Sequence, residues 1–125
     1  MYLSKEMINT ILNKTVVHMF EPTSTIYAIG GEKPPLNLTS FALQFDDGVV
    51  LTIDNKYTVK NVEHRGFIQD SKLIKINQEK DKFIEFVFEK TDCNPVLRVD
   101  MSDAGWVGPE AFNISTPNCT YVFQG

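Results

Sequence analysis

The sequence has few of the residues on which metal binding and nucleophilic catalysis depend. It contains two histidines and two cysteines in 125 residues. His18 lies in an apolar stretch and His64 beside an Arg-Gly pair, and neither is spaced with a nucleophile or a second metal ligand. Cys93 and Cys119 are not in a CxxC-type spacing. We expect His18 to pack in a sheet, His64 to lie in a turn and both cysteines to be buried thiols, without metal or cofactor.

Long apolar runs are also missing. The longest are a few residues, whereas a membrane-spanning helix needs about 20. Lys5 and Glu6 come before any apolar stretch, which is not the order of regions in a secretory signal. The sequence therefore predicts a cytoplasmic protein, with no membrane partner and with its cysteines reduced.

Basic residues are scarce in two parts of the chain. The net charge is −4, residues 21–55 hold five acidic residues and one lysine, and no Lys or Arg follows Arg98. Direct binding to nucleic acid needs clustered Lys and Arg, so we do not expect it. No phosphate-binding loop accompanies Gly30-Gly31. The acidic surplus fits a basic protein partner, and it also fits an ordinary solvated surface.

Two stretches have the pattern of a β-hairpin. In the first, the alternating residues 41–45 and 49–54 flank Asp46-Asp47-Gly48, which supplies the glycine that a tight turn needs. In the second, residues 84–88 and 96–101 flank a polar segment. Side chains two residues apart share one face of a strand, so each hairpin has an apolar face. We expect the following to be buried: Phe41, Leu43, Phe45, Leu51, Ile53, Phe86, Phe88, Leu97 and Val99.

The remaining elements complete a single domain over residues 1–125. Ser4 is placed to cap a short helix that ends near Asn13. Further strands are expected at 16–20, 25–29, 57–62, 73–76, 83–88, 111–115 and 120–123. The predicted class is α+β, mainly β: one curled antiparallel sheet or partly open barrel with a short N-terminal helix.

Two pairs of acidic residues and one acidic loop are candidate sites. Asp46/Asp47 and Asp100/Asp103 could be the two carboxylates of a glycosidase. Asp46 and Asp47 also suit a hairpin turn, and Asp103 suits a turn or a helix cap. Residues 100–112 hold the one tryptophan, Trp106, and no basic residue. A tryptophan in such a loop can anchor a protein interface or cover the open end of a sheet.

These motifs resemble small bacterial immunity proteins of polymorphic-toxin and contact-dependent growth inhibition systems. The resemblance rests on Phe-x-Leu-x-Phe-Asp-Asp-Gly-Val-x-Leu-x-Ile in the first hairpin and on Asp-x-Ser-Asp-x-x-x-x-Gly-Pro-Glu-Ala after the second. It spans residues 41–123. Where such proteins carry Tyr before Gly-Pro-Glu-Ala, this chain has Trp106 followed by Val107.

The resemblance implies a protein that is not an enzyme and that needs no cofactor. It would bind the C-terminal toxin domain of its own system, a nuclease with a basic cleft, and block the active site or the access of substrate. The residues expected to contact that partner are Asp46, Asp47, Asp103, Trp106 and Glu110. The alternatives are a ligand-binding module or small enzyme that uses the interior of a curled sheet, and an adaptor subunit.

Overall fold

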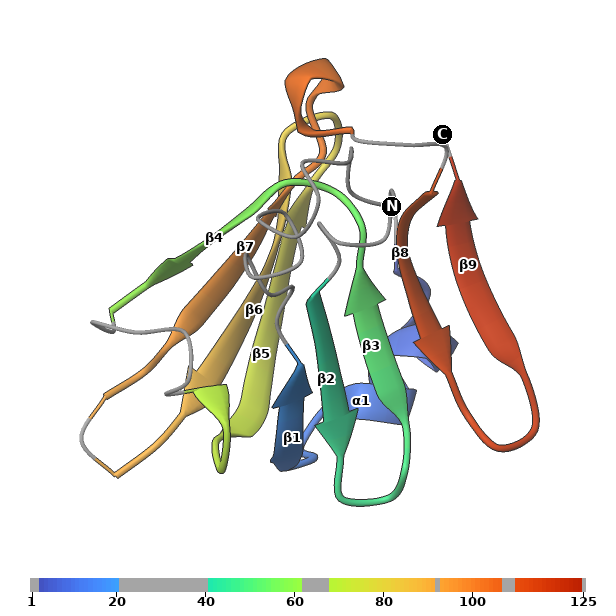
Figure 1. Ribbon diagram of the computed structural model, residues 1–125. Helices are drawn as coiled ribbons and strands as arrows, with labels where there is room; N and C mark the ends of the chain where they lie inside the picture. The colour runs from blue at the N-terminus through green and yellow to red at the C-terminus, as the bar shows by residue number, and fades with distance from the viewer. Residues whose placement is uncertain (1–2, 21–40, 62–67, 92, 107–109, 125) are drawn as a thin grey trace, which may run out of the picture.

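The computed structural model describes residues 3–20, 41–61, 68–91, 93–106 and 110–124 (Figure 1). These residues form mainly antiparallel strands and one short N-terminal helix, as the sequence predicted. The elements are α1 (Lys5–Ile11), β1 (Val16–Phe20), β2 (Phe41–Phe45), β3 (Val50–Ile53), β4 (Tyr57–Lys60), β5 (Lys72–Glu79), β6 (Phe83–Glu89), β7 (Val96–Asp100), η3 (Asp103–Gly105), β8 (Glu110–Ser115) and β9 (Thr120–Gln124). The strand expected at residues 25–29 lies outside the described residues.

The strands form two sheets, which differs from the single curled sheet that was predicted. One sheet has the order β1-β2-β3-β8-β9 and the other β4-β7-β6-β5. Each predicted hairpin is present, but β2–β3 belongs to the first sheet and β6–β7 to the second. The chain crosses between the sheets after β3, where the buried Asn55 donates a hydrogen bond to the Asp100 carbonyl at 2.9 Å. An isolated bridge between Thr15 and Lys72 joins the sheets at one end.

The core lies between the two sheets. Every second side chain of β2, β6 and β7 is buried, which is the alternation expected of strands with one face on a core. All nine side chains predicted to be buried have no exposed surface. They belong to one continuous cluster of buried apolar residues. Burial of each large apolar side chain contributes about 1.5–3 kcal/mol.

Helix α1 covers one side of this core. Ser4 caps it as predicted, because its hydroxyl accepts a hydrogen bond from the Met7 N–H at 3.2 Å. Ile11 is buried, and Met7 and Ile8 pack against the same core. No helix in the described ranges has the length and apolar character needed to cross a bilayer.

A β-bulge in β1 corrects the expectation for His18. Val16 pairs with Phe45 and His18 with Gln44, so Val17 is an extra residue in this strand. Without the bulge, His18 would point to the same side as the buried Val16. The extra residue turns His18 outward, and it is exposed instead of packed in the sheet.

The cysteines are also more exposed than predicted. Cys119 is an exposed thiol in the turn between β8 and β9, and Cys93 is a half-buried thiol between β6 and β7. In the turn between β8 and β9, the Thr116 hydroxyl accepts hydrogen bonds from the N–H groups of Asn118 and Cys119. This capping fixes the turn at the surface and leaves the Cys119 side chain outside the core.

Candidate functional site

Asp46 and Asp47 form the tip of the β2–β3 hairpin, with Gly48 at φ 87° as the turn requires. Both carboxylates are exposed, but Asp47 is engaged within the molecule. It forms an ion pair with Lys14, and its Oδ1 accepts a hydrogen bond from the Val49 N–H at 3.2 Å. Partial desolvation opposes ionisation, but the hydrogen bonds from Lys14 and Val49 outweigh it and lower the pKa of Asp47. Asp46 is therefore the better placed of the two for an external partner.

Asp103 and Trp106 lie at the opposite end of the molecule. Asp103 begins the short helical turn η3 and is exposed. Trp106 is half-buried and packs against the core, so it covers the end of the sheets. Gly105 is buried here, and an added Cβ would lie 2.2 Å from the Asp100 carbonyl oxygen. Residues 103–105 are thus fitted closely to the end of β7.

Glu110 begins β8 at this same end and pairs with Gln124 of β9. Its side chain lies outside the described residues. The five residues predicted to contact a partner therefore do not form one cluster. The turn between β2 and β3, which contains Asp46 and Asp47, lies at the lower end of the view in Figure 1, and η3 and the start of β8 lie at the upper end.

The outer face of the five-stranded sheet lies between these two ends. Its side chains form two rows across β2, β3, β8 and β9, and each row follows the strand register. The residues are Ala42, Thr52, Asn113 and Val122 in one row, and Gln44, Val50, Ser115 and Thr120 in the other. We call these eight residues the uncharged face, because none of them is ionisable; in β1 the second row continues with the ionisable His18, which pairs with Gln44.

This uncharged face is partly open to solvent. Six of its side chains are half-buried, whereas Thr120 and Val122 are exposed. Val122 is the one large apolar side chain that is well exposed among the described residues, with 45% of its surface accessible. None of these eight outward positions carries a charge, in a chain in which 22% of the residues are charged. Depletion of charge at the centre is typical of protein interfaces.

The paired acids do not form a glycosidase-like site in this structure. Asp46 and Asp47 are neighbours in a turn, and Asp47 is paired with Lys14. Asp100 accepts two hydrogen bonds at its Oδ1 from Ser102, from the N–H at 2.9 Å and from the hydroxyl at 2.5 Å. Asp100 therefore has a turn-forming role, whereas the sequence had suggested such a role for Asp103. No grouping of three potential metal ligands occurs in the part of the chain that the structure describes, and His64 lies outside it.

Comparison with known proteins finds no family model, no curated protein and no solved structure that matches this chain. The uncharged face was missed by reasoning from sequence. Its signal was present as alternate uncharged positions in four strands, such as Ala42 and Gln44 in β2 or Asn113 and Ser115 in β8. The order of the strands was needed to show that these positions are adjacent.

Proposed function

We propose that this protein is an immunity protein that binds and neutralises a cognate toxin domain in the cytoplasm. The observation that supports the proposal is the uncharged face, eight adjacent outward side chains without a charge on a rigid sheet. Burying such a surface leaves no charge without a partner, and its hydroxyl and amide groups can form hydrogen bonds with the partner. The partner lies over this face and blocks the toxin's active site or the path of its substrate.

The acidic residues at the two ends of the sheet act at the rim of this interface. Asp46 lies at the tip of the β2–β3 hairpin. Asp103 begins η3, whose Gly105 carbonyl accepts a hydrogen bond at 2.8 Å from the N–H of Lys56, shortly after the end of β3. Charges at a rim steer association with a partner of opposite charge more than they add to affinity. A toxin domain with a basic surface, such as a nuclease cleft, is complementary to this arrangement.

The alternative of a ligand held inside a curled sheet is less well supported. The space between the two sheets is filled by buried apolar side chains, including Phe41, Phe45 and Phe86. A ligand there would have to displace part of this core. The outer surfaces are therefore the better candidates for binding.

Co-expression with the toxin domain encoded beside this gene tests the proposal. Asn113→Lys places a charge at the centre of the uncharged face and should abolish protection of the cells. Asn77→Lys is the matched control, because Asn77 is a half-buried residue of β5 that pairs with Glu85 on the other sheet. This variant should protect like the wild type. Failure of the wild-type protein to protect, or full protection by folded Asn113→Lys, would contradict the proposal.

A further inference from the structure

The four-stranded sheet carries a second surface feature, a groove with basic side chains. The groove has a volume of about 630 Å³ and is lined by Lys56, Tyr57, Thr58, Lys82, Arg98 and Asp100. These residues come from three separate parts of the chain, the start of β4, the turn before β6 and the end of β7. Strand pairing brings them together, because Thr58 pairs with Arg98 and the Met101 N–H donates to the Lys82 carbonyl.

The side chains that line the groove include more cations than carboxylates, although the whole chain carries a net charge of −4. Three cationic side chains line it against one carboxylate, that of Asp100. The Oδ1 of Asp100 is held by the N–H and the hydroxyl of Ser102. This carboxylate anchors the loop after β7. The lining itself has three cationic side chains against one carboxylate, and Glu85 and Glu79 contact Arg98 and Lys82 from outside the lining.

Arg98 is held in place on the floor of the groove. Its guanidinium carbon lies 4.1 Å from the centre of the Phe83 ring, and its Nη1 is 3.6 Å from a carboxylate oxygen of Glu85. A guanidinium has five N–H donors in a planar fork, so these contacts leave donors for another group. Lys82 contacts Glu79 at 3.0 Å, but both side chains are largely exposed, and a stronger anion can replace this pair.

We propose that this groove binds a small molecule that carries a phosphate group. Two lysines and one arginine supply the charge and the forked donors that a phosphate requires. The Thr58 hydroxyl adds a further donor. The Tyr57 ring packs against the core, with its centre 4.9 Å from that of the Phe41 ring, so Tyr57 borders the groove at the edge of β4. The volume lies within the range of small-molecule sites in proteins. The site is on the other sheet from the uncharged face, so it does not depend on the proposed function.

Nuclear magnetic resonance titration of the full chain tests this site with ribose 5-phosphate and with ribose, which lacks the phosphate. Ribose 5-phosphate should give saturable shifts at residues 56–58, 82 and 98–100, and ribose should give none. Inorganic phosphate should give the same pattern with weaker binding if the sugar contributes contacts. Equal shifts with ribose, or no saturable shift with ribose 5-phosphate, would overturn the proposal.

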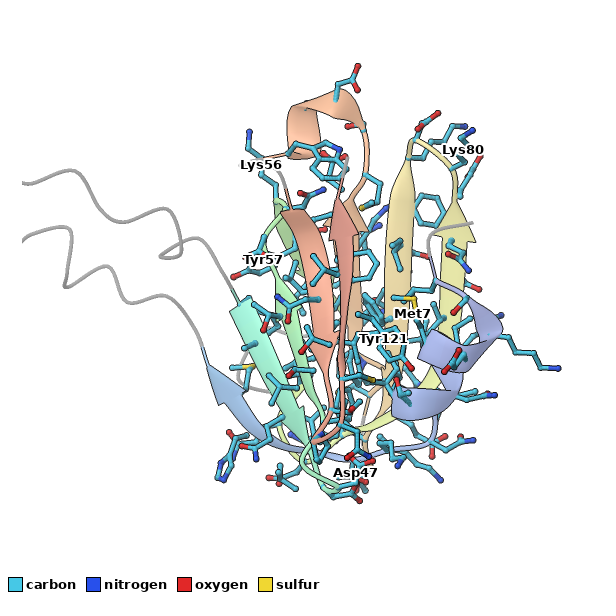
Figure 2. All side chains as sticks on the ribbon, turned by 90° about the vertical axis from the view of Figure 1, so that its right-hand side faces the viewer. Met7, Asp47, Lys56, Tyr57, Lys80 and Tyr121 are labelled. Atoms are coloured by element: carbon cyan, nitrogen blue, oxygen red, sulfur yellow. The ribbon has the colours of Figure 1, made fainter. Side chains whose placement is uncertain are left out.

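Lysine variants separate a specific site from general attraction. The double substitution Lys56→Gln with Lys82→Gln should weaken ribose 5-phosphate binding at least tenfold, and both side chains are exposed, so folding should be preserved. Lys80→Gln is the matched control, because Lys80 lies at the same end of the molecule but across it from Lys56 and Tyr57 (Figure 2). Arg98→Lys keeps the positive charge but removes the planar guanidinium group with its paired N–H donors, and it should weaken ribose 5-phosphate binding severalfold. An equal loss from Lys80→Gln would overturn the proposal in favour of non-specific attraction.

Discussion

At the scale of single residues, Phe86 tests whether the core has the described arrangement. It is fully buried in β6, whereas its neighbour Val87 points to the outer face and is half-buried. Phe86→Ala should lower the free energy of unfolding by about 3–5 kcal/mol, because it removes a large side chain and leaves a cavity. Val87→Ala should cost less than about 1 kcal/mol, as is usual for surface substitutions. Urea unfolding measures both, and similar losses in the two variants would mean that the strand faces are reversed.

The ion pair between Lys14 and Asp47 makes a second prediction at this scale. The folded pKa of Asp47 is below its ordinary value of 3.8, so ionised Asp47 stabilises the fold above that pH. The contribution is lost as the pH falls through the lowered pKa. The stabilisation should stay below about 1 kcal/mol because the pair is at the surface.

Lys14→Gln should raise the pKa of Asp47, because it removes a hydrogen bond and a neighbouring charge while the desolvation remains. Carbon-detected magnetic resonance of the Asp47 carboxyl group measures the titration directly. Lys75→Gln is a suitable control, since Lys75 is an exposed lysine of β5 on the other sheet. An unchanged Asp47 titration in Lys14→Gln would show that this ion pair does not form in solution.

At the scale of elements, Tyr121 connects β9 with α1. Its hydroxyl donates a hydrogen bond to the Glu6 carboxylate at 2.9 Å, and Tyr121 also packs against the core (Figure 2). Hydrogen bonds to Cys119 and to Glu6 raise the pKa of Tyr121 to about 12. The phenol form therefore stabilises the contact below the ordinary pKa of 10, and this stabilisation is lost as the pH rises through about 12.

Ultraviolet titration should show that the Tyr121 phenol ionises near pH 12. Tyr121→Phe should remove this titration step and speed amide hydrogen exchange in α1, because the helix loses its connection to β9. Thr120→Val alters the neighbouring residue of the same strand and should leave both readouts unchanged. If the ionisation near pH 12 remained in Tyr121→Phe, it would belong to another tyrosine.

Local sequence patterns predicted the elements well because hairpins and caps depend on neighbouring residues. The alternation around Asp46-Asp47-Gly48 gave the first hairpin, and Ser4 gave the start of the helix. The division into two sheets arises because the chain leaves the first sheet after β3 and enters the second at β4. No local sequence pattern predicts this crossing. The bulge at Val17 likewise depends on the pairing of β1 with β2, and so the outward position of His18 was missed.

The candidate sites were less predictable than the elements. The sequence indicated that Asp46 and Asp103 are turn residues. It did not indicate that they lie at opposite ends of the molecule, because this depends on the length of the β2–β3 hairpin. The uncharged face and the basic groove each combine side chains from distant parts of the sequence. Composition could show that charges are scarce or abundant, but only the strand register shows which residues are adjacent.

At the scale of the whole molecule, the two ends of the sheet should control the rate of association with the toxin domain. Asp46→Lys should slow association at low salt, and the difference from wild type should shrink as ionic strength rises. Glu89→Lys makes the same change of charge on the other sheet and should have a smaller effect. Stopped-flow or surface plasmon resonance measurements can separate association from dissociation. A larger slowing by Glu89→Lys would place the partner on the four-stranded sheet.

The central claim is that the uncharged face is the surface that binds the partner. Its most direct test is calorimetric measurement of the affinity of the purified toxin domain for the Asn113→Lys and Asn77→Lys variants. A lysine buried without a partner at an interface should weaken binding by at least tenfold, whereas the same substitution on the other sheet should change it less than twofold. Wild-type affinity in folded Asn113→Lys, or an equal loss in Asn77→Lys, would contradict the claim.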